Sequence, residues 1–192
     1  LLLLYTLNTR TIRGETELRA LLNIPCFGSL PMIHFKRRTQ NTNKEINMLY
    51  DRNCEDYTEA MRLVRTRLER QMDDKKVLMV TSSIPGEGKS TVAANLAISM
   101  AQKGKKVVLV DCDLRNPSQG KIFNLPGGYP GLLSILRGES KLEDSLVEVT
   151  HNDEPLGLTI LAGGDNQSRS VEILGGEEMS RVLEELKTRA DA

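Results

Sequence analysis

The sequence lacks the features that define several specialised classes of protein. Its 192 residues include only three cysteines, far apart and without a CxxC pair or a nearby histidine cluster, so neither a disulfide framework nor a zinc site is expected. No apolar run approaches the roughly 20 residues that span a bilayer. The 26 basic and 26 acidic side chains cancel, so the whole chain has no general electrostatic affinity for nucleic acid.

What is present is typical of an ordinary globular protein. Hydrophobic residues make up 39% of the chain, and its length suits one domain of roughly 150 residues with an appendage. The charge is unevenly distributed, with a net +8 over residues 1–138 and a net −8 over residues 139–192. This asymmetry indicates either a basic and an acidic functional face or simply two solvated surfaces.

The first 54 residues differ in character from the rest. Leu1–Tyr5 is a short apolar run, which we interpret as the end of a membrane helix or as a frayed terminus. Periodicity predicts a helix over residues 15–23, and a short strand over residues 26–30. Residues 34–54 are polar and basic, so they predict a linker whose charges are solvated or touch anionic lipid.

From residue 55 onward the pattern predicts alternating helices and strands. An apolar stripe at three- and four-residue spacing predicts a helix over residues 55–72. Short apolar runs predict strands over 77–81, 107–110 and 158–162, and the helices expected between and after them span 91–103, 131–137, 142–149 and 177–189. Repeated β–α units imply an α/β fold with a doubly wound parallel sheet.

The most informative motif lies between the first of these strands and its helix. Ser82–Thr91 resembles the phosphate-binding pattern G-x-x-x-x-G-K-[ST], with Ser83 at the first glycine. Glycines let backbone N–H groups turn inward toward an anion, and the lysine reaches the β- and γ-phosphates. The hydroxyl of the following serine is a Mg²⁺ ligand in such loops. The candidate nucleotide-binding residues are Pro85, Gly86, Glu87, Gly88, Lys89, Ser90 and Thr91.

A second acidic element follows the strand at 107–110. Asp111 and Asp113 stand at the carboxyl end of this strand, where ligands bind in open α/β sheets. Two carboxylates beside a phosphate loop hold Mg²⁺ or accept a proton from an attacking hydroxyl. We therefore take Lys89, Asp111 and Asp113 as candidate catalytic residues, and Ser90 with both aspartates as metal ligands. A turn with a helix-capping aspartate is the structural alternative.

Together these motifs resemble the cytoplasmic domain of bacterial tyrosine kinases, P-loop proteins that control capsular and exopolysaccharide assembly. The run from Val107 to Arg115 is similar to the second motif of that family, a hydrophobic run followed by D-x-D-x-R. Glu59, Arg62 and Arg65 match its E-x-x-R-x-x-R motif, and Leu21–Pro31 resembles the segment that follows the second membrane helix in full-length members.

The resemblance implies a function and a set of partners. It implies an ATP- and Mg²⁺-dependent kinase that phosphorylates tyrosines of neighbouring copies at the cytoplasmic face of the plasma membrane. A transmembrane polysaccharide co-polymerase region is the implied partner, in cis or as a second protein. Residues 1–33 would be membrane-proximal, 34–54 a linker and 55–192 the kinase domain. Glu59, Arg62 and Arg65 would lie at the subunit contacts of a ring oligomer.

The sequence departs from the family pattern in three respects. Residues 165–172 lack the prolines expected in the family, which leaves the shape of this loop undefined. Neither the apolar strand ending in the Walker B acid nor a tyrosine cluster follows. We therefore expect a fragment with an incomplete sheet, and weak or no activity from this fragment alone.

Two other functions remain open from the residues. One is a non-kinase ATPase switch of the partitioning type, but those proteins begin their loop K-G-G-x-G-K-[ST], and the position of the first lysine is Ile84 here. The other is a catalytically inactive module that binds nucleotide only to assemble a ring.

Overall fold

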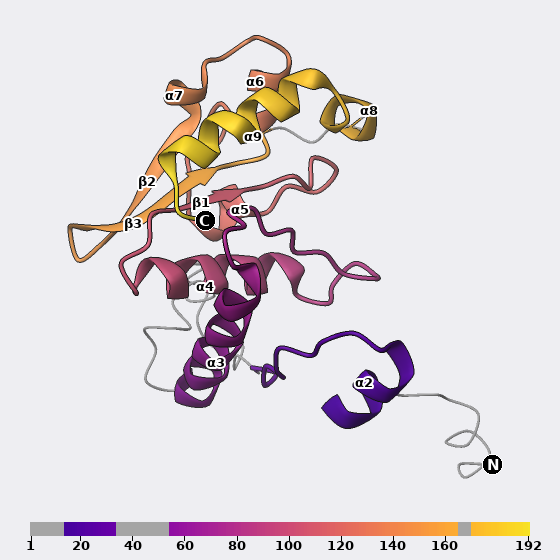
Figure 1. Cartoon of the computed structure of the whole chain (residues 1–192). Coiled ribbons are helices and arrows are strands. Elements are labelled where there is room, and N and C mark those ends of the chain that lie inside the picture. Colours follow the sequence, from indigo (N-terminus) through magenta and orange to yellow (C-terminus); the bar gives the residue numbers. More distant parts are fainter. Residues whose placement is uncertain (1–13, 34–53, 165–169) are drawn as a thin grey trace, which may run out of the picture.

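A computed structural model describes residues 14–33, 54–164 and 170–192 of the chain. Leu1–Tyr5, nearly all of the expected linker and most of the loop at 165–172 lie outside these residues. Within them the order of helices and strands confirms the α/β class. Figure 1 shows a small sheet with α3 and α4 on one side and α6, α7 and α9 on the other. The helices span Glu15–Leu22 (α2), Glu55–Met72 (α3), Lys89–Ala101 (α4), Gln119–Ile122 (α5), Leu132–Leu136 (α6), Leu142–Ser145 (α7), Ser170–Leu174 (α8) and Glu177–Arg189 (α9).

Three strands of the described chain form one sheet in the order β1-β3-β2. β1 (Val107–Val110) runs parallel to β3 (Glu154–Leu161), with Val107 opposite Leu158. β2 (Leu146–His151) pairs antiparallel with β3 and carries an irregularity after Val149. The sheet is therefore mixed rather than wholly parallel, and its parallel pair places the end of β1 beside the end of β3.

Two apolar layers hold the helices onto the sheet. One layer joins α3 and α4 to the sheet through residues such as Met61 and Leu158, both completely buried. The other joins α6 and α9 to the opposite face through Leu132, Leu161 and Val182. Each layer covers one face of β1, which explains why this strand is apolar without alternation. The sheet is thereby fixed as the platform on which the loops at its carboxyl edge are built.

Three sequence predictions of local structure are wrong. Residues 77–81 and 26–30 form no strand, because an apolar run becomes a strand only beside a hydrogen-bonded neighbour, and no described residue pairs with either segment. Val77 and Met79 are 51% and 83% exposed. The helix expected over 142–149 ends at Ser145, where β2 begins and pairs with β3.

The edge of β1 away from β3 is partly occupied by the residues after α9. The Val108 amide donates to the Ala192 carbonyl over 2.9 Å, and the Asp191 amide donates to the Lys106 carbonyl over 2.7 Å. The Lys76 ammonium donates to the carbonyls of Lys187 and Ala190, which ties the extended segment at 77–81 to the same region. Among the described helices, none combines the length and hydrophobicity needed to cross a bilayer.

Tyr57 is a buried residue in the first turn of α3. Its side chain is 5% exposed, and its hydroxyl has no hydrogen-bond partner among the described residues. Burial, with a smaller contribution from Cys54, raises the pKa of Tyr57 from 10.0 to about 12. Tyr57→Phe is expected to raise the free energy of unfolding by about 1 kcal/mol in urea titrations, because it removes a buried hydroxyl that no described residue pairs with.

The same residue predicts a dependence of stability on pH. Because the folded pKa of Tyr57 lies above the unfolded value, the unfolded chain releases its proton first as the pH rises above 10. The native protein should therefore lose stability from pH 10 upward, by about 2 kcal/mol at pH 12. The phenylalanine variant should lose correspondingly less over this range. Parallel pH profiles of the two proteins would contradict the assignment.

Candidate nucleotide-binding site

The phosphate loop is shaped by two glycines before α4. Gly86 and Gly88 have φ angles of 87° and 88°, a left-handed conformation that residues with a Cβ rarely adopt. Gly88 is the N-cap of α4, and its carbonyl accepts the amide of Val92 over 2.8 Å. The amides at the start of α4 therefore face the loop, where they and the helix dipole favour an anion.

Glu87 accepts hydrogen bonds from other residues of the same loop. Its Oε2 accepts hydrogen bonds from the Ser83 amide (2.9 Å), the Ile84 amide (3.3 Å) and the Ser83 hydroxyl (3.0 Å). The Ile84 amide is the largest of the influences that lower the pKa of Glu87. Ser82 Oγ donates to the Ile84 carbonyl over 3.1 Å. These bonds hold residues 82–87 in one turn without using the amides at the start of α4.

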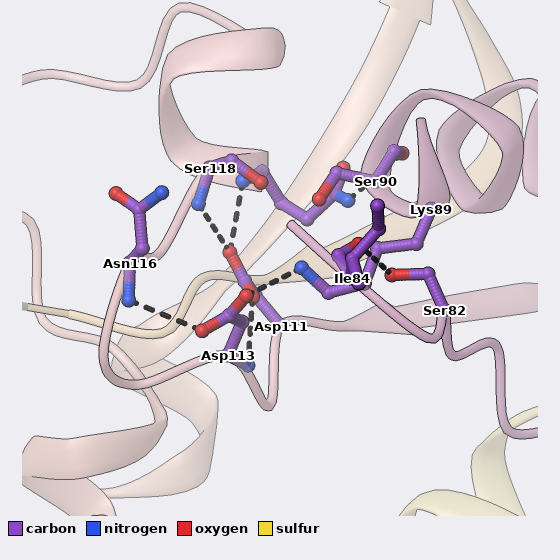
Figure 2. Close-up of polar contacts among 9 residues, drawn as sticks. Ser82, Ile84, Lys89, Ser90, Asp111, Asp113, Asn116 and Ser118 are labelled. Carbon is purple, nitrogen blue, oxygen red and sulfur yellow. Dashed lines mark hydrogen bonds and ion pairs between the residues drawn. The ribbon is translucent and has the colours of Figure 1, made fainter. Parts of the chain in front are cut away.

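Lys89 and Asp113 meet at the open side of the loop. Lys89 Nζ lies 2.5 Å from Asp113 Oδ2, and the two side chains are 34% and 27% exposed (Figure 2). The hydrogen bond from Lys89 holds the pKa of Asp113 below its usual value, with a further contribution from the Asn116 amide. The carboxylate is therefore ionised at neutral pH and stands beside the cation expected to contact phosphate.

Asp111 occupies a different environment from Asp113. It is 5% exposed, and its Oδ2 accepts the amides of Ser118 and Gln119, each over 2.8 Å, at the start of α5. Its Oδ1 accepts the amide of Asp113 over 3.1 Å, so both oxygens bind backbone groups (Figure 2). Asp111 thus caps α5 and orients Asp113. The capping role is the structural alternative that the sequence also indicates.

Gln119 is a site residue that sequence reasoning missed. Its Nε2 donates to the Ser90 carbonyl over 3.1 Å, which links the start of α5 to the first turn of α4. The side chain is 4% exposed, and its Oε1 has no partner among the described residues. Nothing in the local sequence distinguishes Gln119 from a surface residue, because its burial depends on contacts between segments far apart in the chain.

The structure brings some of the candidate residues together and separates others. Lys89, Ser90 and Asp113 gather at one end of α4, and Pro85, Gly86, Glu87, Gly88 and Thr91 form the adjoining loop and first turn. Glu59, Arg62 and Arg65 lie on α3, apart from this site. Arg62 Nη1 lies 2.5 Å from Glu59 Oε1 on an exposed face. Arg65 Nη1 instead donates to the Ser99 carbonyl over 2.7 Å and to Ser99 Oγ over 3.1 Å.

The donor set is compatible with Mg²⁺ bound together with phosphates. Ser90 offers a hydroxyl and Asp113 a carboxylate, and Mg²⁺ usually takes one or two carboxylates, with waters and substrate phosphates as its other ligands. The described residues contain no cluster of three or more histidine, cysteine or acidic side chains suited to a metal ion. A metal here would therefore depend on the nucleotide for part of its coordination.

Comparisons with known proteins show which families this chain resembles. Residues 73–143 match the ParA model, described as NUBPL iron-transfer P-loop NTPase. The chain is 38% identical to the tyrosine-protein kinase YwqD of Bacillus subtilis over 130 residues, which are 67% of this chain and 53% of that protein. Among solved structures, the BceF tyrosine kinase domain gives a TM-score of 0.77 at 26% identity, covering 94% of this chain and 74% of that one.

The VpsO kinase domain is 35% identical with a TM-score of 0.59, and the match covers 73% of this chain and 70% of that structure. The fold and the loop define a P-loop NTPase. Within that class, the chain belongs to the bacterial tyrosine-protein kinase family. It spans 53% of YwqD and 17% of the putative tyrosine-protein kinase EpsB of Ralstonia solanacearum, so it corresponds to only part of these relatives.

Proposed function

We propose that this chain is part of an ATP-dependent protein-tyrosine kinase that regulates the synthesis and export of capsular polysaccharide or exopolysaccharide. The observation that carries the proposal is the ionised Asp113 bound to Lys89 at the mouth of a phosphate loop. A carboxylate in this position accepts the proton of a tyrosine hydroxyl or holds a metal ion, and the family membership favours tyrosine as the acceptor.

Each residue of the site has a separate role in phosphate transfer. The amides of the loop and of the start of α4 bind the phosphates, and Lys89 neutralises charge on the β- and γ-phosphates. Asp113 receives the proton of the attacking hydroxyl or reaches the metal with Ser90, while Asp111 holds Asp113 in place through its amide. Bound Mg²⁺ would supply charge neutralisation between the phosphates.

The experiment that tests this function follows labelled phosphate from ATP onto tyrosine in the full-length protein. Phosphotyrosine that appears with the native protein and is lost with Asp113→Asn supports the proposal. ATP hydrolysis without phosphotyrosine would favour the ATPase switch instead. Binding without either reaction would favour the inactive assembly module.

The proposal extends to location and assembly. We infer that the parent protein acts at the cytoplasmic face of the bacterial plasma membrane, with a transmembrane polysaccharide co-polymerase region as its partner. The inferred substrates are tyrosines of neighbouring copies in a ring. The division into a membrane-proximal segment (1–33), a linker (34–54) and a kinase domain (55–192) belongs to the same proposal. Support comes from the motif match on α3 and from the exposure of Glu59 and Arg62.

Arg62 and Arg65 give separable predictions for the ring. Arg62→Ala is expected to shift the full domain toward monomer in sedimentation velocity, with unchanged thermal stability, because the Arg62 guanidinium pairs with the exposed Glu59 and with no other described side chain. Arg65→Ala is expected to lower the free energy of unfolding by about 1–3 kcal/mol as well, because it leaves the Ser99 carbonyl without its guanidinium. If the Arg62 variant sediments like the native domain, this face of α3 is ordinary solvated surface and not a subunit contact.

A further inference from the structure

A hollow of about 330 Å³ lies between the segment after α2 and the C-terminal half of α3. Seven described residues line it, and three of them are arginines, namely Arg19, Arg67 and Arg70. Pro25 and Phe27 form its apolar wall. The hollow is far in sequence from the phosphate loop, and the proposed kinase reaction does not use it.

The positive charge of this hollow is not neutralised by any described residue that lines it. Arg19 Nη2 donates to the Cys26 carbonyl over 3.0 Å, and Arg67 Nη1 donates to the Phe27 carbonyl over 3.2 Å. Carbonyls orient a guanidinium without cancelling its charge, and none of the described residues that line the hollow carries a carboxylate. Glu69, between two of the arginines in sequence, instead pairs with Lys103 and Lys105 over 2.7 and 3.7 Å. The arginines therefore retain N–H donors for an anion.

Exposed apolar side chains lie next to these arginines. Leu21, Leu22 and Ile24 are 60%, 53% and 51% exposed, and α2 contains no buried residue. Leu22 follows Arg19 by one helical turn, so their side chains are neighbours on the helix surface. Figure 1 shows α2 at the periphery of the molecule, away from the sheet.

The same segment is nevertheless fixed to the domain. Phe27, Leu30 and Ile33 pack against the core layer that includes α3. The chain therefore anchors residues 27–33 and presents residues 19–24 outward. A fixed, exposed apolar cluster beside arginines that no described lining carboxylate neutralises is the pattern of a surface that inserts into the headgroup region of an anionic bilayer.

We propose that Arg19, Arg67 and Arg70, with Leu21, Leu22 and Ile24, form a docking surface for an anionic phospholipid bilayer, which we call the α2 surface. The guanidinium groups bind lipid phosphates, for which their planar N–H donors are well suited. The leucines and Ile24 enter the boundary between headgroups and acyl chains. A free phosphate ion would use the arginines but would leave the apolar cluster without a role. The proposal rests on the inferred membrane location and is independent of phosphate transfer.

The test measures partition of the full chain onto vesicles by sedimentation, without ATP. We expect binding to vesicles of equal parts phosphatidylcholine and phosphatidylglycerol, and little binding to phosphatidylcholine alone. Each arginine near an anionic surface contributes about fivefold in partition, so Arg19→Gln with Arg70→Gln should lower the partition coefficient about 25-fold. Leu21→Ser with Leu22→Ser should lower it at least about fivefold, because apolar insertion is lost.

Matched controls separate the α2 surface from general charge effects. Arg181→Gln removes the same charge from an exposed position on α9 and should change the partition less than about twofold. Arg70→Gln alone keeps the contact between Arg19 and Cys26 and should still give about a fivefold loss. Lys89→Met should bind vesicles as the native chain does, so failure of the kinase proposal and failure of this one are distinguishable.

Several outcomes would overturn the proposal. Equal binding to neutral and anionic vesicles would do so, as would an equal loss in the Arg181 variant. Displacement from vesicles by millimolar O-phosphotyrosine, with inorganic phosphate inactive, would assign the hollow to a phosphorylated peptide. A change of oligomeric state in the Leu21 and Leu22 variant without lipid would assign the apolar cluster to a second copy of the chain.

Discussion

Replacing Lys89 with methionine is expected to lower phosphate transfer at least about 100-fold and to weaken Mg·ATP binding, while the domain stays folded. Lys89 stands at the start of α4 with its ammonium 2.5 Å from Asp113 Oδ2, at the open side of the loop. Methionine has a similar length but no charge, so the loop amides alone would face the phosphates. Loss of one preorganised donor to a developing charge typically costs two to three orders of magnitude.

The measurement is isothermal titration with Mg·ATP, with circular dichroism as the check on folding. Lys121→Met is the matched control, since Lys121 is an exposed lysine on α5 and is expected to leave affinity within about twofold. Asp113→Asn should retain nucleotide binding but lose phosphate transfer, because the amide neither accepts the hydroxyl proton nor carries charge. Unchanged affinity for Mg·ATP in the Lys89 variant would contradict the assignment of the phosphate site.

Gly131→Ala is expected to lower the free energy of unfolding by about 3 kcal/mol or more. Gly131 is the N-cap of α6, and a Cβ placed on it would lie 2.4 Å from the Gly164 nitrogen and 2.5 Å from the Ala162 oxygen. These are backbone atoms at the end of β3 and cannot rotate away. The clash would separate α6 from β3 and stretch the 2.7 Å hydrogen bond from the Leu132 amide to the Ala162 carbonyl.

Urea unfolding of Gly131→Ala beside Gly127→Ala tests this packing. A Cβ at Gly127 would meet no atom within 4 Å, so this variant should differ from the native chain by no more than about 0.5 kcal/mol. Both changes add one methyl group at a glycine, so their difference isolates the close approach. Equal stability of the two variants would show that α6 and the end of β3 can separate without cost.

The long helices were predicted well because their apolar pattern repeats over several turns. The apolar stripe of residues 55–72 persists over several turns, and the structure confirms that helix with the same bounds, as it does the helix at 177–189. The strand at 107–110 is likewise confirmed. Val77–Thr81 carries an equally apolar pattern, but strand formation depends on a neighbour, which local sequence does not specify.

The turn between β2 and β3 contains residue types that predict a hairpin. Asn152 and Asp153 both adopt positive φ, at 52° and 64°, in the two-residue turn between these strands. Asparagine and aspartate are among the residues that favour such turns. Giving weight to this turn would have predicted two strands around it in place of a helix through Val149.

The candidate site was predictable as a place in the chain but not as a geometry. Motif spacing located Lys89 and both aspartates. It did not distinguish Asp111, whose oxygens bind the amides of α5, from Asp113, which faces Lys89. That difference arises because the chain turns immediately after β1, so each carboxylate meets a different set of donors.

The contact between Arg65 and Ser99 has a consequence for experiments at different protein concentrations. If Arg62 joins neighbouring copies, mass action should restore assembly of an Arg62 variant as its concentration rises. A defect caused by loss of the Arg65 contact lies within one chain, between α3 and the helix that begins at Lys89, and should persist at every concentration. Two arginines three residues apart would thus be distinguished by a dilution series.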